Sequence, residues 1–208
     1  MSEDAPHEEQ GSSPEAPGSR VHIAKLSQQG YQLVRENRLD RAEEKFREIL
    51  RYDDRNNYAL VGLGDAARKR GECPRAVEHY QRCLENHPEN NYALFGLADC
   101  YKSMRQYQRA IEVWERYLKY DDSNVTVLTR VADAYRKVRN FDRSRELYER
   151  VLDLEENNAY AIIGLAHLHY DFKRYEKALY YWKWMLNQSG RRVDIRVLTS
   201  IGNCYRKL

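Results

Sequence analysis

The sequence NYALVGLGDAARKRGECPRAVEHYQRCLENHPEN at residues 57–90 is followed directly by NYALFGLADCYKSMRQYQRAIEVWERYLKYDDSN at residues 91–124. The two stretches have equal length, and the small residues Gly64 and Ala98 stand at the same place in each. The spacing of 34 residues continues at Ala132 and Ala166. A fixed period of this length is typical of arrays of repeated helical units, so the repeat decides the fold.

The first half of each unit has the pattern of a helix with one apolar face. Positions are counted from the first residue of each unit, which is Ile23, Asn57, Asn91, Val125 or Ala159. Position 4 is always apolar, and position 8 is always small: Gly30, Gly64, Ala98, Ala132 and Ala166. Apolar residues three and four apart mark one face of a helix. A small residue on that face lets a second helix approach closely.

The second half of each unit predicts that second helix. Position 20 is small (Ala42, Ala76, Ala110, Ser144, Ala178), and position 24 is an aromatic ring (Phe46, Tyr80, Trp114, Tyr148, Trp182). We expect each ring to fill the space beside the small residue of a neighbouring helix. Deleting such a ring costs about 3–5 kcal/mol.

Polar and small residues mark the start of each unit and the turn between its two helices. Asparagine precedes each new first helix at Asn56, Asn90, Asn124 and Asn158, where its side chain can cap free backbone N–H groups. The turn between the two helices of a unit carries Asn37, Gly71 or Asn140, residues that tolerate left-handed backbone.

These repeated positions resemble the tetratricopeptide-repeat family over about residues 23–208. The resemblance implies an all-α fold, a right-handed α-solenoid of antiparallel helix pairs. Its units are residues 23–56, 57–90, 91–124, 125–158 and 159–194, with a partial sixth at 195–208. Residues 21–208 would form the solenoid. Residues 1–20 are acidic and rich in proline and glycine, so we expect a disordered tail.

Composition restricts the class of protein. The formal charge of the chain is +3, which divides into −4 for the tail and +7 for the remainder. Basic residues recur at position 19 (Arg41, Arg75, Arg109, Arg143, Lys177), and we interpret them as an exposed face paired with glutamates. No block of consecutive basic residues favours nucleic acid. No signal peptide or apolar run of about 18 residues predicts export or a membrane span. The four cysteines lack metal-type spacing, so we expect reduced thiols and a cytoplasmic protein.

The sequence offers little for catalysis. His167 and His169 are two residues apart, so on a helix they point to different sides and cannot chelate one metal ion. Gly62-Leu63-Gly64-Asp65 is reminiscent of a phosphate loop but lies inside a predicted helix, where no free N–H groups face a ligand. We therefore predict a protein that is not an enzyme and holds neither cofactor nor metal.

The family resemblance implies a groove lined by the first helices of the units. Positions 2, 5, 9, 12 and 13 would face it. The candidate residues are Tyr58, Val61, Asp65, Arg68, Tyr92, Phe95, Asp99, Lys102, Thr129, Asp133, Arg136, Tyr160, Ile163 and His167. Exposed aromatic side chains make good anchors for a ligand. The aspartates would select basic groups, unless they only neutralise the neighbouring arginines and lysines.

Two specialised groove types of the family do not fit. A carboxylate clamp needs Lys at position 5 and Asn at position 9, and a sugar-transferase groove carries Asn at position 6. Here position 6 holds Gly62, Gly96, Arg130 and Gly164, and we expect the three glycines to leave open floor in the groove.

The leading hypothesis is a scaffold or adaptor that binds a peptide or helix of another protein. The alternatives are a self-assembling module, since a homo-oligomer is compatible with the partial sixth unit, or a regulatory arm of a larger enzyme or complex.

Overall fold

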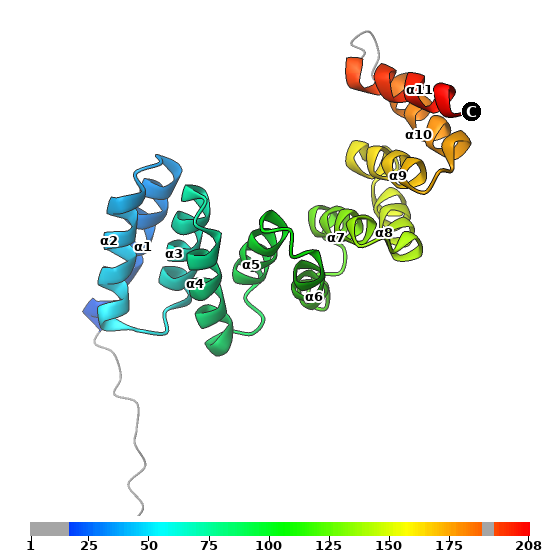
Figure 1. Cartoon of the computed structure of the whole chain (residues 1–208). Coiled ribbons are helices and arrows are strands. Elements are labelled where there is room, and N and C mark those ends of the chain that lie inside the picture. The colour runs from blue at the N-terminus through cyan, green and yellow to red at the C-terminus, as the bar shows by residue number, and fades with distance from the viewer. Residues whose placement is uncertain (1–16, 189–193) are drawn as a thin grey trace, which may run out of the picture.

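The structure, a computed structural model, describes residues 17–188 and 194–208, and these residues form eleven helices and no strand. Consecutive helices pack as antiparallel pairs that stack into a right-handed α-solenoid, as the sequence predicts (Figure 1). The helices are α1 (Pro17–Arg35), α2 (Leu39–Tyr52), α3 (Asn57–Arg70), α4 (Cys73–Asn86), α5 (Asn91–Ser103), α6 (Tyr107–Leu118), α7 (Val125–Lys137), α8 (Phe141–Leu154), α9 (Ala159–Asp171), α10 (Tyr175–Gln188) and α11 (Ile195–Lys207).

The first helix begins earlier than the sequence indicates. Residues 17–20, which we assigned to the tail, form the first turn of α1. Pro17 suits this place because the first N–H groups of a helix have no partner within it. The expected disorder of residues 1–16 lies outside the described residues.

Asparagine and aspartate caps fix the start of the later first helices. The side chain of Asn56 accepts a hydrogen bond from the backbone N–H of Ala59, and Asn90, Asn124 and Asn158 make the same bond in their units. Asp194 caps α11 by accepting from the N–H of Arg196. Such a cap is worth about 1 kcal/mol, so the sequence itself sets where each unit begins.

Aromatic rings of the second helices pack between two first helices. A Cβ added to Gly64 in α3 would lie 2.5 Å from the ring of Tyr80, and one added to Gly96 in α5 would lie 2.3 Å from the same ring. The ring of Phe46 contacts Gly30 and Gly62 in the same way. The predicted contact between ring and small residue is therefore confirmed for these two rings.

The expectation for the position 6 glycines is wrong. Gly62, Gly96 and Gly164 do not leave open floor in a groove, because the rings of Phe46, Tyr80 and Tyr148 occupy the space beside them. Each of these three glycines makes room for a ring that belongs to the preceding unit.

The turn inside each unit holds one residue with positive φ at position 15. These residues are Asn37, Gly71, Arg105, Arg139 and Lys173, with φ between 60° and 84°. Asn140 does not take this role: its φ is −91°, and its side chain caps α8 by accepting from the N–H of Arg143. The turn geometry thus repeats even where the residue type does not favour it.

Candidate functional site

A groove follows the first helices of the units and consists of three adjoining hollows. They measure about 880, 540 and 620 Å³ and lie along α1 to α5, around α3 to α7, and along α5 to α9. Asp65 and Tyr92 line both the first and the second hollow, and Thr126 lines both the second and the third. The structure therefore brings all the predicted groove residues except Asp99 to the walls of one continuous depression.

Three tyrosines at position 2 stand along this groove. Tyr58 is 61% exposed, Tyr92 is 79% exposed and Tyr160 is 77% exposed. They lie just after the asparagine caps of α3, α5 and α9, so the capped first turn of each helix holds them in place. Large exposed rings with few rotatable bonds lose little entropy when a ligand covers them.

Most of the exposed surface of the first hollow is apolar, although polar side chains such as Gln28, Asp53 and Asn90 also line it. Ile23, Tyr31, Tyr58, Val61 and Tyr92 line it, and the hydroxyl of Tyr31 donates a 2.9 Å hydrogen bond to the backbone oxygen of Tyr58. Val61 is only 4% exposed, so it belongs mainly to the core and supports the hollow from below. Tyr31 was not predicted as a groove residue, although it is position 9 of the first unit, in the same row as Asp65.

The three groove aspartates already have partners within the chain. Asp65 accepts from the hydroxyl of Tyr80 at 2.7 Å and from Arg68 at 3.4 Å. Asp99, with a side chain only 12% exposed, pairs with Arg130 of the next first helix and lies 3.8 Å from Arg68. The carboxylate of Asp99 is therefore held between two first helices and is not free for a ligand.

Asp133 completes this row of ion pairs. It accepts from Arg136 at 2.7 Å and lies 3.6 Å from Lys102, while Arg136 also pairs with Asp171. Burial favours the neutral acid, but the hydrogen bond and charge of Arg136 keep the pKa of Asp133 below its usual value. All three aspartates are thus paired within the chain, and their selection of basic ligand groups stays a prediction. The pairs join neighbouring units along the floor of the groove.

Side chains in the second and third hollows are also held by neighbours. Phe95 is half-buried, and the guanidinium of Arg130 lies 4.9 Å from the centre of its ring. In the third hollow, the ring of His167 packs edge-on against Trp182 at 4.9 Å. Thr129 bonds to its own helix through the backbone oxygens of Val125 and Thr126. Lys102 and Ile163 are half-buried and line the third hollow.

The two close histidines have separate environments. His169 is 2% exposed, stacks on Tyr181 at 5.5 Å and meets Phe141 edge-on at 5.3 Å. His167 instead faces the groove beside Trp182. Within residues 17–188 and 194–208, no group of three His, Cys, Asp or Glu side chains is placed to hold a metal ion.

In the basic row at position 19, Arg75 and Arg143 pair with acids, whereas Arg109 donates to the side-chain oxygen of Gln106 at 3.1 Å. Arg75 donates to Glu72 at 2.9 Å and to the buried Glu43 at 2.6 Å. Arg143 donates to Glu146 at 2.8 Å. These contacts favour a structural role for Arg75 and Arg143, and for the row as a whole the pairing with glutamates stays a prediction.

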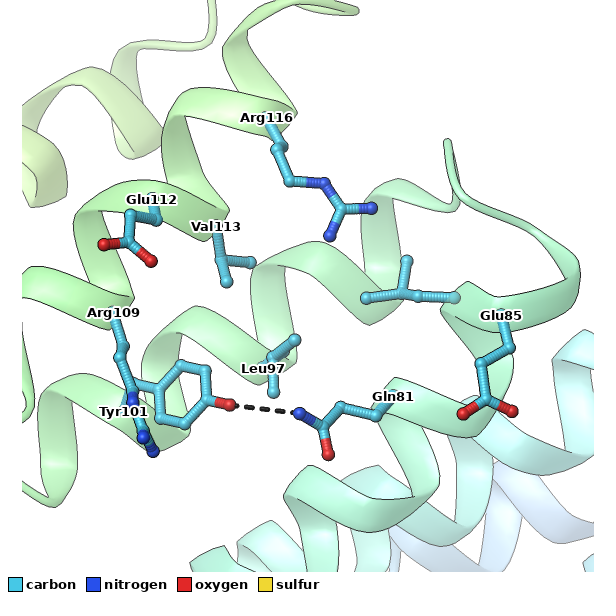
Figure 2. Close-up of a pocket in the computed structure, with 9 residues that line it drawn as sticks. Gln81, Glu85, Leu97, Tyr101, Arg109, Glu112, Val113 and Arg116 are labelled. Atoms are coloured by element: carbon cyan, nitrogen blue, oxygen red, sulfur yellow. Dashed lines mark hydrogen bonds between the residues drawn. The ribbon is translucent and has the colours of Figure 1, made fainter.

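A further hollow of about 540 Å³ lies between α4 and α6, with α5 below it (Figure 2). The side-chain amide of Gln81 donates to the hydroxyl of Tyr101 at 3.2 Å, and Arg109 lies 5.7 Å from the centre of the Tyr101 ring. This hollow was not predicted, because the sequence pattern places Tyr101 on the apolar face of its helix. Its hydroxyl and ring face already have partners, so the longer groove is the stronger candidate site.

Of the helices that the structure describes, none has the length and apolar character to cross a membrane.

Comparison with known proteins supports the repeat assignment. The family described as tetratricopeptide repeat matches residues 28–82, 61–125 and 129–182. Solved structures with a similar fold include a tetratricopeptide repeat protein from Parabacteroides merdae, at 19% identity over 90% of this chain and 73% of that one, with a TM-score of 0.80. A MamA protein has 16% identity over 84% of this chain and 93% of its own, with a TM-score of 0.74. No curated protein sequence matches the chain.

Proposed function

The chain belongs to the tetratricopeptide-repeat family, whose members are generally protein–protein interaction modules and typically non-catalytic, and from this premise we propose a scaffold or adaptor. In this proposal the chain holds a peptide or short helix of a partner protein in the groove along α1, α3, α5, α7 and α9. It works in the cytoplasm, since its four cysteines are unpaired thiols.

The observation that carries the proposal is the row of exposed tyrosines over a continuous groove. Tyr58, Tyr92 and Tyr160 are each more than half exposed, although they stand on rigid, capped helix starts. A partner that covers these rings gains buried apolar area worth about 25 cal/mol per Å². Aromatic anchors of this kind dominate the energy of many interfaces.

The internal ion pairs define the chemistry of the ligand. Asp65, Asp99 and Asp133 each have a partner within the chain, so a basic ligand would have to displace Arg68, Arg130 or Arg136. The first hollow instead presents apolar and aromatic walls. We infer a ligand whose apolar side chains enter the hollows and whose backbone lies along the tyrosines.

A comparison of two triple variants tests this function. Tyr58→Ala, Tyr92→Ala and Tyr160→Ala together remove the groove rings. Tyr52→Ala, Tyr120→Ala and Tyr180→Ala remove three rings that are similarly exposed, at 57–62%, but line none of the three groove hollows. Both variants and the unchanged chain serve as baits in native lysate, after circular dichroism has established equal helicity.

We expect proteins that bind the unchanged chain and the control variant but not the groove variant. Their binding segments, mapped as synthetic peptides, should carry apolar residues that enter the hollows. If both variants retain the same proteins, the groove is not the binding surface.

A further inference from the structure

The turns inside the units and the junctions between units lie on opposite edges of the solenoid. Because consecutive helices are antiparallel, the turn between α1 and α2 and the turn between α3 and α4 lie at one edge (Figure 1). The loops that lead from α2 to α3 and from α4 to α5 lie at the other edge. Residues that share a position near a turn therefore form a row along one edge of the molecule.

The two edges carry opposite charge. Positions 14 to 19 of the five units hold eleven basic and five acidic residues, a net charge of +6. We call this set the basic edge, and it consists of residues 36–41, 70–75, 104–109, 138–143 and 172–177. Positions 29 to 34 of the first four units hold three basic and nine acidic residues, a net charge of −6. This set is the acidic edge, and it consists of residues 51–56, 85–90, 119–124 and 153–158.

Many cations of the basic edge are not neutralised within the chain. Arg70, Arg75 and Arg143 pair with acids. In contrast, four exposed side chains form no ion pair with an acid in the part of the chain that the structure describes: Arg41, Arg105, Lys173 and Lys177. Five of the six net positive charges of the basic edge belong to the third, fourth and fifth units. The charge available to a ligand is therefore concentrated at the turns of these three units.

Aromatic rings support two further cations of this edge. The guanidinium of Arg174 lies 3.9 Å from the centre of the Phe141 ring, and that of Arg139 lies 4.2 Å from the centre of the Phe172 ring. Both arginines are exposed even though a ring supports them. A guanidinium that already rests on a ring loses less side-chain entropy when it binds a carboxylate. These two arginines are therefore suited to bind an anionic group of a ligand.

The backbone of the basic edge supplies an independent observation. At position 15, Arg105, Arg139 and Lys173 have φ between 60° and 65°. In the first two units the same position holds Asn37 and Gly71, residue types that adopt left-handed backbone at lower cost. Three successive units thus place a long basic side chain where its backbone is strained. Strain of this kind is found mostly at functional positions.

We propose that the basic edge of the third to fifth units binds an acidic segment of a partner protein through Arg105, Arg139, Lys173, Arg174 and Lys177. The carboxylates of the segment pair with these five side chains. A guanidinium donates two parallel hydrogen bonds to one carboxylate, so the three arginines give the contact its geometry. This surface is distinct from the groove and gives the chain a second contact with a partner.

The chemistry of the edge favours an acidic protein segment over other polyanions. Single-stranded nucleic acids bind where their bases stack on open aromatic faces, whereas guanidinium groups lie over the rings of Phe141 and Phe172. The helix pairs also turn from one unit to the next (Figure 1). A flexible chain follows the successive turns, whereas a flat lipid surface or a stiff duplex meets fewer of them. The family consists generally of protein–protein interaction modules, which agrees with this choice.

A fluorescein-labelled peptide in which glutamate alternates with serine serves as the probe. Its binding to the full chain is followed by anisotropy at low ionic strength, because salt screens exposed charges. The edge variant combines Arg105→Gly, Arg139→Gly and Lys173→Gly. Glycine removes the charge and also relieves the backbone strain, so a loss of binding by this variant does not result from unfolding. Circular dichroism and thermal unfolding check this point.

The matched control removes three exposed cations from the acidic edge, as Arg51→Gln, Arg55→Gln and Lys119→Gln. Both variants lower the formal charge of the chain from +3 to 0, so attraction that depends on net charge alone weakens equally. We expect at least a ten-fold higher Kd for the edge variant and less than a two-fold change for the control. The groove variant should bind the peptide normally, which separates this surface from the proposed groove.

Three results would overturn the proposal. The first is no binding of the acidic peptide by the unchanged chain. The second is an equal loss of binding in the edge variant and the control, because net charge alone would then explain the attraction. The third is tighter binding of a single-stranded RNA with the same number of charges, or of phosphatidylserine vesicles, that the edge variant loses. The partner of the edge would then be a nucleic acid or a membrane.

Discussion

The hydroxyl of Tyr80 donates a hydrogen bond to the carboxylate of Asp65, with 2.7 Å between the two oxygens. The ring of the same tyrosine lies against Gly64 and Gly96, so one side chain joins the core of two units to the floor of the groove. Burial, followed by the charge of Asp65, raises the pKa of Tyr80 far above its usual value, so the hydroxyl remains a donor at any working pH. The shape of the groove therefore depends on a core residue.

Two substitutions of Tyr80 separate the contribution of its hydrogen bond to stability from that of its ring packing. Tyr80→Phe keeps the ring and removes the hydrogen bond, so the free energy of unfolding should fall by about 1 kcal/mol. Tyr80→Ala also removes the ring and should cost about 3–5 kcal/mol. Urea unfolding followed by circular dichroism measures both. Equal losses in the two variants would show that the hydrogen bond, not the ring, carries the stability.

A pair of glycine substitutions tests the seating of the rings. Gly96→Ala places a Cβ 2.3 Å from the Tyr80 ring, and this overpacking should cost about 1–3 kcal/mol. Gly202→Ala meets no atom within 4 Å and should stabilise α11 by about 0.5–1 kcal/mol, because alanine is the better helix former. In thermal unfolding, the midpoint temperature should therefore fall for Gly96→Ala and rise for Gly202→Ala. A gain in stability for Gly96→Ala would contradict the packing described here.

The solenoid could be predicted from the sequence alone, because the residues that repeat every 34 positions act within their own helix. Asn56 caps the helix that directly follows it, and Leu60 marks the apolar face of that helix. The role of Gly96 could not be assigned in this way. A glycine shows that space is needed, but not whether a ligand or a ring such as Tyr80 takes it.

The groove aspartates show a second limit of sequence reasoning. Asp99 and Arg130 are 31 residues apart, and their pairing depends on how two units stack. From the sequence, acidic and basic residues are both predicted to face the groove. Only the structure shows that these residues form ion pairs with one another. The exposed tyrosines were predictable, because position 2 lies outside the apolar face of the helix.

The positive φ angles at position 15 predict a stabilising substitution. Lys173 has a φ of 62° and is exposed, although left-handed backbone costs a residue with a Cβ about 1–2 kcal/mol. Lys173→Gly removes this strain, and we expect a net gain of about 0.5–1 kcal/mol after the entropy cost of glycine. Gly71→Ala, at the equivalent turn with φ of 84°, should lose about 1 kcal/mol. Unfolding of both variants by urea measures the change in the free energy of unfolding. A lower free energy of unfolding for Lys173→Gly would contradict the argument.

His169 predicts how stability depends on pH. Burial, with the charges of Lys177, Arg174 and Arg145, lowers its pKa to about 4. The folded chain therefore holds a neutral imidazole, whereas the unfolded chain takes up a proton below about pH 6.5. The neutral His169 therefore contributes its full share to the free energy of unfolding above pH 6.5. This contribution is lost as the pH falls from 6.5 towards 4. The loss from this one group is at most about 3 kcal/mol.

His169→Tyr isolates this contribution, because position 11 is tyrosine in both α5 and α7 and a tyrosine does not titrate in this range. Acidic groups elsewhere affect both proteins alike, so the difference between their unfolding free energies reports on His169 alone. We expect that difference to be constant from pH 8 to 7 and to shift in favour of the variant as the pH falls to 4.5. Since the imidazole packs between Tyr181 and Phe141 with no hydrogen-bond partner for its Nδ1 atom, protonation has no compensating contact. Parallel pH curves for the two proteins would mean that His169 titrates normally in the folded chain.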